Sequence, residues 1–305
     1  MSSFERGTIV IMTHNRRPRL LQTLRGLCQL PDRWPIIVID NGSTDGTAEA
    51  VAEEFPSLLL IRSRRNIGSA ARNIAVAFAH TPYVAFCDED TEWLPGSLER
   101  AADIMDAHPS VGVINGCVID ADTGRIDPSC LEMAGSPLNQ DTLPGPQLLR
   151  FSSDSSVVRT RAFYEAGGFW PPLFTHGEEA LLSLDLAEKG WRVVYMDSVL
   201  LRRFHVCGRK VANGQLRAVR NAIWVAWMRL PAELAWRETI NQLRSAANRR
   251  QLRPALMWTL GGFTRVLRER HVIAPQVAAM WTQLMEHAAS QAAHGSRKPS
   301  QESMA

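Results

Sequence analysis

The chain has 305 residues, a hydrophobic fraction of 45% and a formal net charge of +3. This length suffices for one large α/β domain with a helical appendage. The five cysteines show no CxxC spacing, and their odd number argues against a disulfide framework. We find no leader with a cleavage site and no run of about 18 apolar residues, so we expect a cytoplasmic protein without a membrane span.

The charge is distributed unevenly along the chain. Residues 1–200 carry 17 basic and 26 acidic side chains, whereas residues 201–270 carry 15 basic and 3 acidic ones. A break of this kind indicates two regions with different partners. We therefore expect an α/β region over residues 1–212 and a basic helical region over residues 213–289. The polar residues 290–305 are expected to be disordered.

Short apolar runs alternate with amphipathic stretches in the first part of the chain. Strands are predicted at 8–12, 36–40, 58–61, 83–87 and 111–114, and helices at 19–30, 47–55, 69–80 and 94–108. Strands that are apolar on both faces and alternate with helices indicate a parallel sheet covered on both sides. Right-handed crossovers then give a doubly wound α/β domain, whose ligands lie beyond the carboxyl ends of the strands.

The second part of the chain is less regular. Residues 120–151 are rich in Pro, Gly, Ser and Asp and are expected to form a long loop. A strand is predicted at 155–159, a helix at 178–189 with Gly190 as its stop, and a strand at 191–195. From about residue 214 the pattern is helical.

An acidic segment, Asp88-Glu89-Asp90, follows the apolar strand at 83–87. Adjacent carboxylates at the mouth of a buried strand repel each other and are costly unless a cation or donor groups compensate them. Hard oxygen ligands suit Mg²⁺ or Mn²⁺, which hold substrate phosphates with few protein ligands. If the segment stays extended, Asp88 and Asp90 point to one side and Glu89 to the other.

Polar residues follow other strands at the same edge. Asp40, at a strand end, could accept hydrogen bonds from a nucleoside, although the segment 40–47 also fits an ordinary turn. Arg72, in the segment 66–73, could lie near phosphate or order the acidic segment, although tight helix packing explains the small residues there equally well. A lone histidine, His205, is more often structural than a ligand.

A pair of carboxylates, Glu178 and Glu179, opens the helix predicted at 178–189. One interpretation is that the helix dipole favours negative charge at this end. The other is a general base, because a carboxylate ionised at neutral pH can remove a proton from an attacking hydroxyl group.

In their order and spacing, these segments closely resemble family 2 glycosyltransferases over about residues 7–206. The resemblance is carried by segments 10–16, 38–47, 66–73, 86–91, 155–159, 165–169, 177–179 and 190–191. It implies the GT-A fold, a doubly wound mixed sheet with a Rossmann-like nucleotide-binding half (7–115), an acceptor half (116–212) and the helical region after them. It also implies an inverting transfer from a nucleotide-sugar to an acceptor hydroxyl.

The resemblance further implies roles for individual residues. Donor binding would fall to Thr13, Asn15, Asp40, Asn41, Asn66, Gly68, Arg72 and Asp88. The metal, Mg²⁺ or Mn²⁺, would be held by Asp90 and Asp88 of the Asp-x-Asp motif and by His205. Glu179 would be the base with Glu178 as its neighbour, but Glu179 stands where relatives have Asp, so the choice between the two stays open.

The basic region combines Trp and Arg side chains in the way that interfacial membrane helices do. A lipid-linked acceptor and a peripheral contact of residues 213–270 with the inner membrane face would explain this. The alternative is a helical domain packed on the catalytic domain or on a second subunit of a homodimer. The acceptor could also be a sugar or another small molecule. No module for nucleic-acid recognition is apparent, so we expect no nucleic-acid partner. The alternative functions are a nucleotidyltransferase and a non-catalytic nucleotide-binding scaffold.

Overall fold

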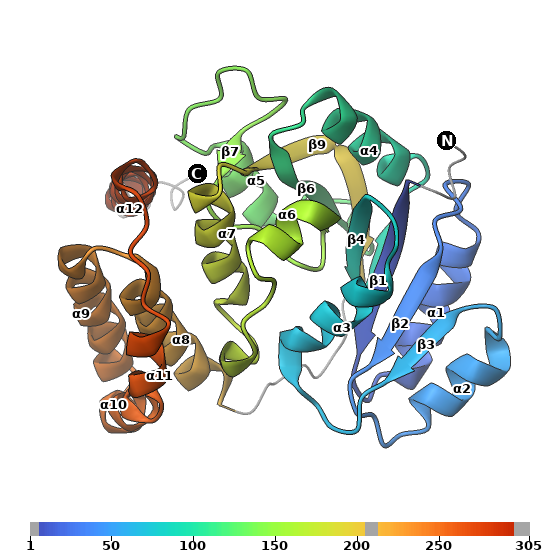
Figure 1. Cartoon of the computed structure of the whole chain (residues 1–305), viewed down its shortest axis with the longest axis horizontal. Helices are drawn as coiled ribbons and strands as arrows, with labels where there is room; N and C mark the ends of the chain where they lie inside the picture. Colours follow the sequence, from blue (N-terminus) through green and yellow to red (C-terminus); the bar gives the residue numbers. More distant parts are fainter. Residues whose placement is uncertain (1–5, 205–212, 296–305) are drawn as a thin grey trace, which may run out of the picture.

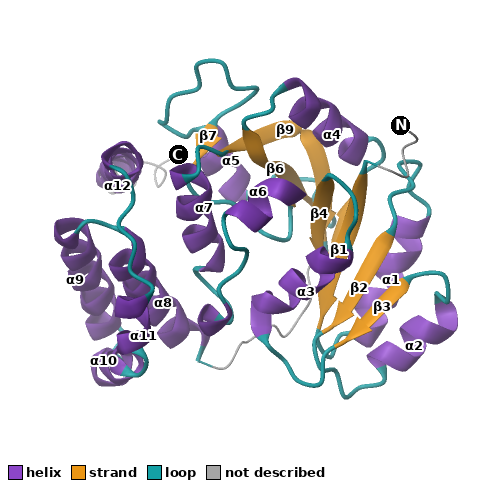
Figure 2. Ribbon diagram, in the orientation of Figure 1, coloured by secondary structure: helices purple, strands orange, loops and turns teal. Residues whose placement is uncertain are grey.

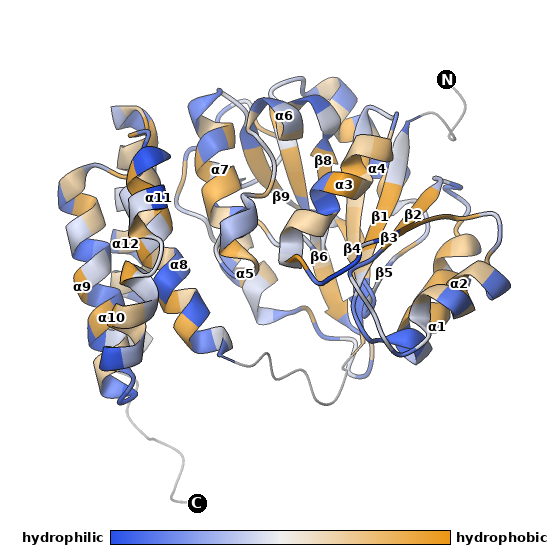
Figure 3. Ribbon diagram, turned by 60° about the horizontal axis from the view of Figure 1, so that its bottom comes forward, coloured by the Kyte–Doolittle hydropathy of each residue, from blue (hydrophilic) through white to orange (hydrophobic). Residues whose placement is uncertain are grey.

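The computed structural model describes residues 6–204 and 213–295. One curved sheet with helices on both faces forms the larger part of the molecule, and a bundle of helices lies beside it (Figures 1 and 2). Apolar strands occupy the interior of the larger part (Figure 3). In the described ranges, no helix is both long and apolar enough to cross a membrane.

Four parallel strands form the first half of the sheet, in the order β3-β2-β1-β4. Their bounds are Gly7–Thr13 (β1), Ile36–Asp40 (β2), Leu59–Arg62 (β3) and Tyr83–Asp88 (β4). They are connected by α1 (Arg17–Cys28), α2 (Thr47–Glu54), and a short 3₁₀ turn, η2 (Gly68–Ala70), that leads into α3 (Ala71–Phe78). The register places Met12 opposite Asp88 and Thr13 opposite Asp40, so the polar ends of β1, β2 and β4 meet at one edge.

The second half makes the sheet mixed, as expected. β8 runs antiparallel between β4 and β6, whereas β9 runs parallel to β6 and also pairs with the short strands β5 and β7. The strands span Thr91–Trp93 (β5), Val111–Asp120 (β6), Gln147–Leu148 (β7), Ser156–Arg159 (β8) and Arg192–Arg203 (β9). The helical segments span Ser97–Ala107 (α4), Pro128–Ala134 (α5), Thr160–Glu165 (α6), Pro171–Leu173 (η3) and Glu178–Glu188 (α7).

Some details differ from the sequence-based predictions. The expected loop at 120–151 contains α5, which Asp127 caps by accepting a hydrogen bond of 2.9 Å from the backbone N–H of Ser129. Residues 290–295, expected to be disordered, belong to a helix that ends at Gly295. The acidic segment is not extended, because Glu89 and Asp90 form a turn that leads β5 away to pair with β9.

The C-terminal helices pack against the larger part through α7. They are α8 (Gly214–Arg229), α9 (Ala232–Asn248), α10 (Leu252–Leu260), α11 (Phe263–Arg268) and α12 (Pro275–Gly295). One buried apolar cluster contains Leu181 and Leu184 of α7 together with Val225 of α8 and Val277 of α12. A nearby ion pair joins Arg229 of α8 to Asp185 of α7, so the helical bundle shares an apolar core with α7 of the larger part.

Candidate active site

A polar cavity of about 370 Å³ lies at the carboxyl edge of the parallel strands. It is lined by Met12, Ser69, Arg72, Asp88, Ser152, Ser153, Asp154, Thr175, His176, Glu178 and Glu179. These residues come from the ends of β1 and β4, the start of α3, the loop before β8 and the start of α7. The cavity therefore brings together residues from both halves of the sheet.

The acidic turn at this edge is buried, with exposed fractions of 6% for Asp88 and 8% each for Glu89 and Asp90. The carbonyl oxygen of Glu89 accepts a hydrogen bond of 2.6 Å from the Thr23 hydroxyl group, and that of Asp90 accepts one of 2.9 Å from the N–H of Phe204. The backbone of the turn is therefore fixed from both sides. This arrangement keeps three carboxylate groups at the mouth of β4.

Asp88 forms a buried ion pair with Arg72, whose side chain is 3% exposed. Burial would lower the pKa of Arg72, but Asp88, followed by Glu179 and Glu178, raises the pKa above its ordinary value. One guanidinium group thus offsets negative charge from the acidic turn and from the start of α7. This guanidinium group therefore provides part of the positive charge that we expected to compensate the adjacent carboxylates.

We expect Arg72→Met to lower the free energy of unfolding by about 3–5 kcal/mol, because it leaves the Asp88 carboxylate buried without its partner. Chemical denaturation followed by fluorescence measures this loss. The double variant Arg72→Met with Asp88→Leu should recover most of it, since no unpaired charge then remains at this pair. If Arg72→Met were as stable as the parent protein, the pair would contribute nothing to stability.

The loop that leads into α7 has an unusual backbone. Phe174, His176 and Gly177 all have positive φ angles, of 67°, 69° and 93°. The fully buried Asn221 of α8 holds this loop, because its amide donates hydrogen bonds of 2.9 Å to the carbonyl oxygens of Leu173 and Thr175 and a further one to that of His176. A residue of the C-terminal helices thus fixes the start of α7.

The two carboxylates at the start of α7 have different surroundings. Glu178 is 5% exposed and accepts a hydrogen bond from the Ser69 hydroxyl group. Glu179 accepts one of 2.9 Å from the Ser153 hydroxyl group. Glu179 also lines two further cavities, of about 460 and 480 Å³. Glu179 is therefore the carboxylate at the junction of three cavities.

Burial, followed by the neighbouring Glu178 carboxylate, raises the pKa of Glu179 to about 7. A carboxyl group with this pKa is divided between its neutral and ionised forms near neutral pH. Such a group is well matched to proton transfer under physiological conditions, because a general base works best with a pKa near the working pH.

The residues expected to bind the donor fall into two groups. Thr13 and Asp40 are buried at adjacent strand ends, and the Thr13 hydroxyl group has no hydrogen-bond partner among the described residues. Asp40 accepts a hydrogen bond of 3.0 Å from the N–H of Ser43, and Asn15 accepts one of 2.7 Å from the N–H of Thr44. Thr13, Asp40, Arg72 and Asp88 thus remain at the strand edge, with Asn15 in the turn beside it.

Asn41, Asn66 and Gly68 form the second group and are joined to one another by hydrogen bonds. The Asn41 amide donates hydrogen bonds of 3.1 Å to the side-chain oxygen of Asn66 and to the carbonyl oxygen of Gly68. Gly68 has a φ of +66°, and a Cβ atom there would lie 2.0 Å from the carbonyl oxygen of Phe174. These contacts lock the loops after β2 and before α3 together, so the three residues shape the edge.

Three further polar residues of this site were not predicted from the sequence. Ser153 donates a hydrogen bond to Glu179, and Asp154 forms a salt bridge of 2.7 Å with Arg203 of β9. Ser69 contacts Glu178. The only sequence signal for these residues is the run of polar side chains just before residues 155–159. Their binding partners are distant in sequence, so no local pattern could predict the contacts.

Only some of the expected metal ligands lie in the described part of the chain. Within residues 6–204 and 213–295, no group of three His, Cys, Asp or Glu side chains is placed to hold an ion. His205, the third expected ligand, lies outside the described residues. Two hard carboxylates, Asp88 and Asp90, remain at the strand edge. This set fits an ion of the Mg²⁺ type, which takes one or two carboxylates and completes its shell with substrate phosphates and water.

The mixed sheet has the GT-A fold. The chain belongs to glycosyl transferase family 2, whose family description matches residues 8–167, just over half of the sequence. It is therefore an enzyme that transfers a sugar from a nucleotide-sugar donor. The alternatives of a nucleotidyltransferase and of a non-catalytic scaffold find no support in this membership.

Individual relatives agree with this assignment. The chain is 28% identical over 242 residues to N-acetylglucosaminyl-diphospho-decaprenol L-rhamnosyltransferase of Mycobacterium tuberculosis, covering 67% of this chain and 78% of the relative. The structure of S. aureus TarS 1–349 in complex with UDP-GlcNAc matches 90% of this chain and 83% of TarS 1–349, with a TM-score of 0.63 and 17% identity. GalNAc-T7 with UDP, GalNAc and Mn²⁺ matches 75% of this chain with a TM-score of 0.60 and 14% identity. The chain spans about half of GalNAc-T7, 49% of its length.

Proposed function

We propose that the protein is an inverting, metal-dependent glycosyltransferase in which Glu179 is the base. The observation that supports this is the position of Glu179, where the polar cavity at the strand edge meets the two other cavities. A donor lying along the strand edge and an acceptor entering from another cavity would then meet at this carboxylate. Ser153 orients it by a hydrogen bond, and burial together with the neighbouring Glu178 keeps the pKa of Glu179 high.

Asp90 and Asp88 would hold Mg²⁺ or Mn²⁺ together with the donor diphosphate. The ion would neutralise charge that develops on the leaving diphosphate. The Mn²⁺ in the GalNAc-T7 structure supports this role. Asp88 is shared with Arg72, which leaves Asp90 as the main metal ligand. Thr13 and Asp40 would contact the nucleoside at the adjacent strand ends.

We expect kcat/KM to fall about tenfold per pH unit below pH 7 and to level off above it. Glu179 must be ionised to accept a proton, and its raised pKa of about 7 places the change there. A series of initial rates from pH 5.5 to 9 measures it. A profile that stays flat down to pH 5.5 would remove Glu179 as the base.

The acceptor in this proposal is a sugar linked to a lipid through diphosphate. The name of the mycobacterial relative supports this class of acceptor. The surface of the C-terminal helices supports it independently. Large apolar side chains are exposed on α9 and α10, namely Trp236, Ile240, Leu252, Leu256, Met257 and Leu260.

Basic side chains accompany this apolar surface. Arg244, Arg250, Arg253 and Arg268 are exposed on or beside α9, α10 and α11. Other arginines of the region have internal roles, since Arg220 donates hydrogen bonds to two carbonyl oxygens and Arg229 pairs with Asp185. The membrane contact in this proposal is therefore narrower than residues 213–270 and consists of the exposed side of α9, α10 and α11, at the inner membrane face.

We expect the protein to co-sediment with vesicles that contain anionic lipid at low salt, and to lose most of this binding when Met257 and Leu260 are both changed to Ser. Vesicle co-sedimentation measures the bound fraction. The exposed Leu131 of α5 provides a matched control, because Leu131→Ser alters an apolar side chain on the other part of the molecule. Equal binding by all three proteins would contradict the proposed surface.

The donor is identified by thermal shift with UDP, GDP, dTDP and nucleoside triphosphates, each with and without Mn²⁺. A nucleoside diphosphate that raises Tm only with the metal supports the proposal. A donor-hydrolysis assay with nucleotide-sugars of that base then follows. A triphosphate that is turned over to pyrophosphate would instead indicate a nucleotidyltransferase.

A further inference from the structure

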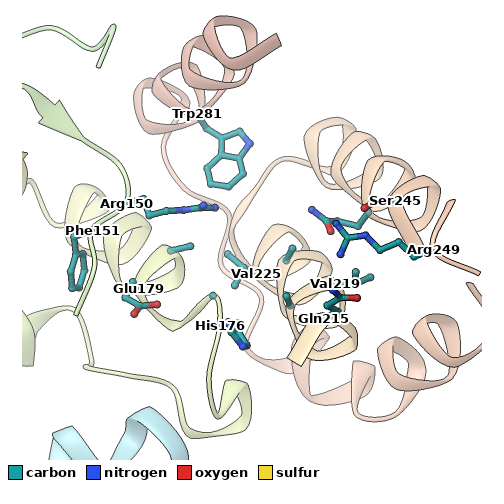
Figure 4. A pocket seen from close by; sticks show the side chains of 15 residues that line it. Arg150, Phe151, His176, Glu179, Gln215, Val219, Val225, Ser245, Arg249 and Trp281 are labelled. Atoms are coloured by element: carbon teal, nitrogen blue, oxygen red, sulfur yellow. The ribbon is translucent and has the colours of Figure 1, made fainter. Parts of the chain in front are cut away.

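The cavity of about 460 Å³ lies between the larger part and the C-terminal helices (Figure 4). Arg150 and Phe151 line it from the segment after β7, and His176 and Glu179 line it at the start of α7. The opposite wall belongs to α8, α9 and α12 and includes Gln215, Gln242, Ser245, Arg249 and Trp281. The helical bundle thus completes a cavity that reaches the proposed base.

Two guanidinium groups lie across this cavity from each other. The Arg150 side chain extends toward the helices below Trp281, and Arg249 lies on the far side (Figure 4). Within residues 6–204 and 213–295, neither arginine forms a salt bridge. The only carboxylate among the lining residues is Glu179, and the remaining polar groups at the far wall are neutral. The charge of this cavity is therefore suited to an anion.

We propose that this cavity binds the diphosphate group of the acceptor, with Arg150 and Arg249 as its ligands. Arginine is favoured for phosphate because its planar group can donate two parallel hydrogen bonds. A sugar attached to this diphosphate could extend from Arg150 toward Glu179, which lines the same cavity. The proposal rests on the proposed function, since it takes Glu179 as the base.

The test compares two acceptor probes. One is N-acetylglucosaminyl diphosphate with a short alkyl chain, and the other is the alkyl N-acetylglucosaminide without phosphate. We expect Arg150→Ala and Arg249→Ala each to raise KM for the first probe about tenfold, with no change for the second probe or for donor hydrolysis. Arg100→Ala is the matched control, because this exposed arginine of α4 does not line the cavity. Equal changes for both probes, or none, would overturn the proposal.

A binding measurement tests the anion subsite independently of the proposed acceptor. In the presence of a chelator, which removes the metal from the donor edge, pyrophosphate should raise Tm of the parent protein and of Arg100→Ala but not of Arg150→Ala or Arg249→Ala. If the parent protein used neither acceptor probe but showed this pattern of Tm shifts, the proposed acceptor would be contradicted and the anion subsite supported. If pyrophosphate stabilised all four proteins equally, the subsite would be wrong.

Discussion

Glu179→Gln should lower kcat by about 10³-fold while the affinity for the nucleotide-sugar donor stays the same. Glutamine keeps the shape of the side chain and can still contact Ser153, but it cannot accept a proton from the attacking hydroxyl group. The magnitude follows from general-base catalysis, which contributes about 10²–10⁴-fold. Steady-state kinetics and donor titration measure the two quantities separately.

The neighbouring carboxylate provides the control. Glu178→Gln should retain most of its turnover, because Glu178 is bound to Ser69 and lines only the cavity at the strand edge. The small remaining rate of Glu179→Gln should also not change between pH 6 and pH 8, since the titrating group is gone. An inactive Glu178→Gln beside an active Glu179→Gln would assign the base to the other carboxylate.

The second large effect is expected at the acidic turn. Asp90→Ala should abolish metal-dependent transfer and reduce the rate by more than about 10³-fold, because the charge on the leaving diphosphate then loses several kcal/mol of stabilisation. Transfer is measured with increasing Mn²⁺ and, in parallel, with a chelator. The parent protein should lose its activity in the chelator, and the residual rate of the variant should be indifferent to it.

Asp122→Ala serves as the control for this experiment, because Asp122 is exposed in the turn after β6 and does not line the cavity at the strand edge. It should keep both the rate and the response to Mn²⁺. Full activity of Asp90→Ala in the chelator would show that Asp90 holds no metal needed for transfer.

The parallel half of the sheet could be predicted because its signals are local. β1, β2 and β4 are continuous apolar runs, and each is followed by polar residues at its carboxyl end. β5 could not be predicted in this way. It has only three residues, and its pairing with β9 depends on a strand more than one hundred positions later. The turn at Glu89 and Asp90 was missed for the same reason.

The site was predictable in its location but less so in its details. Adjacent glutamates such as Glu178 and Glu179 carry no sequence signal that says which one faces an acceptor. The structure separates them through Ser69, in the turn before α3, and Ser153, in the loop before β8. The family resemblance implies that Asn41 binds the donor, but no sequence pattern shows that its amide also donates hydrogen bonds to Asn66 and Gly68 of a later loop.

The contact of Asn221 with the loop before α7 has a consequence for engineering. The charge pattern suggests a joint near residue 212, at which helices could be exchanged to change the acceptor. The amide of Asn221, however, reaches back across that joint to three carbonyl oxygens between Leu173 and His176. A chimera joined at residue 212 would therefore change the helices that line the proposed acceptor cavity and would also displace the proposed base at the start of α7. Transplanting the loop at 173–177 together with the helices would avoid this.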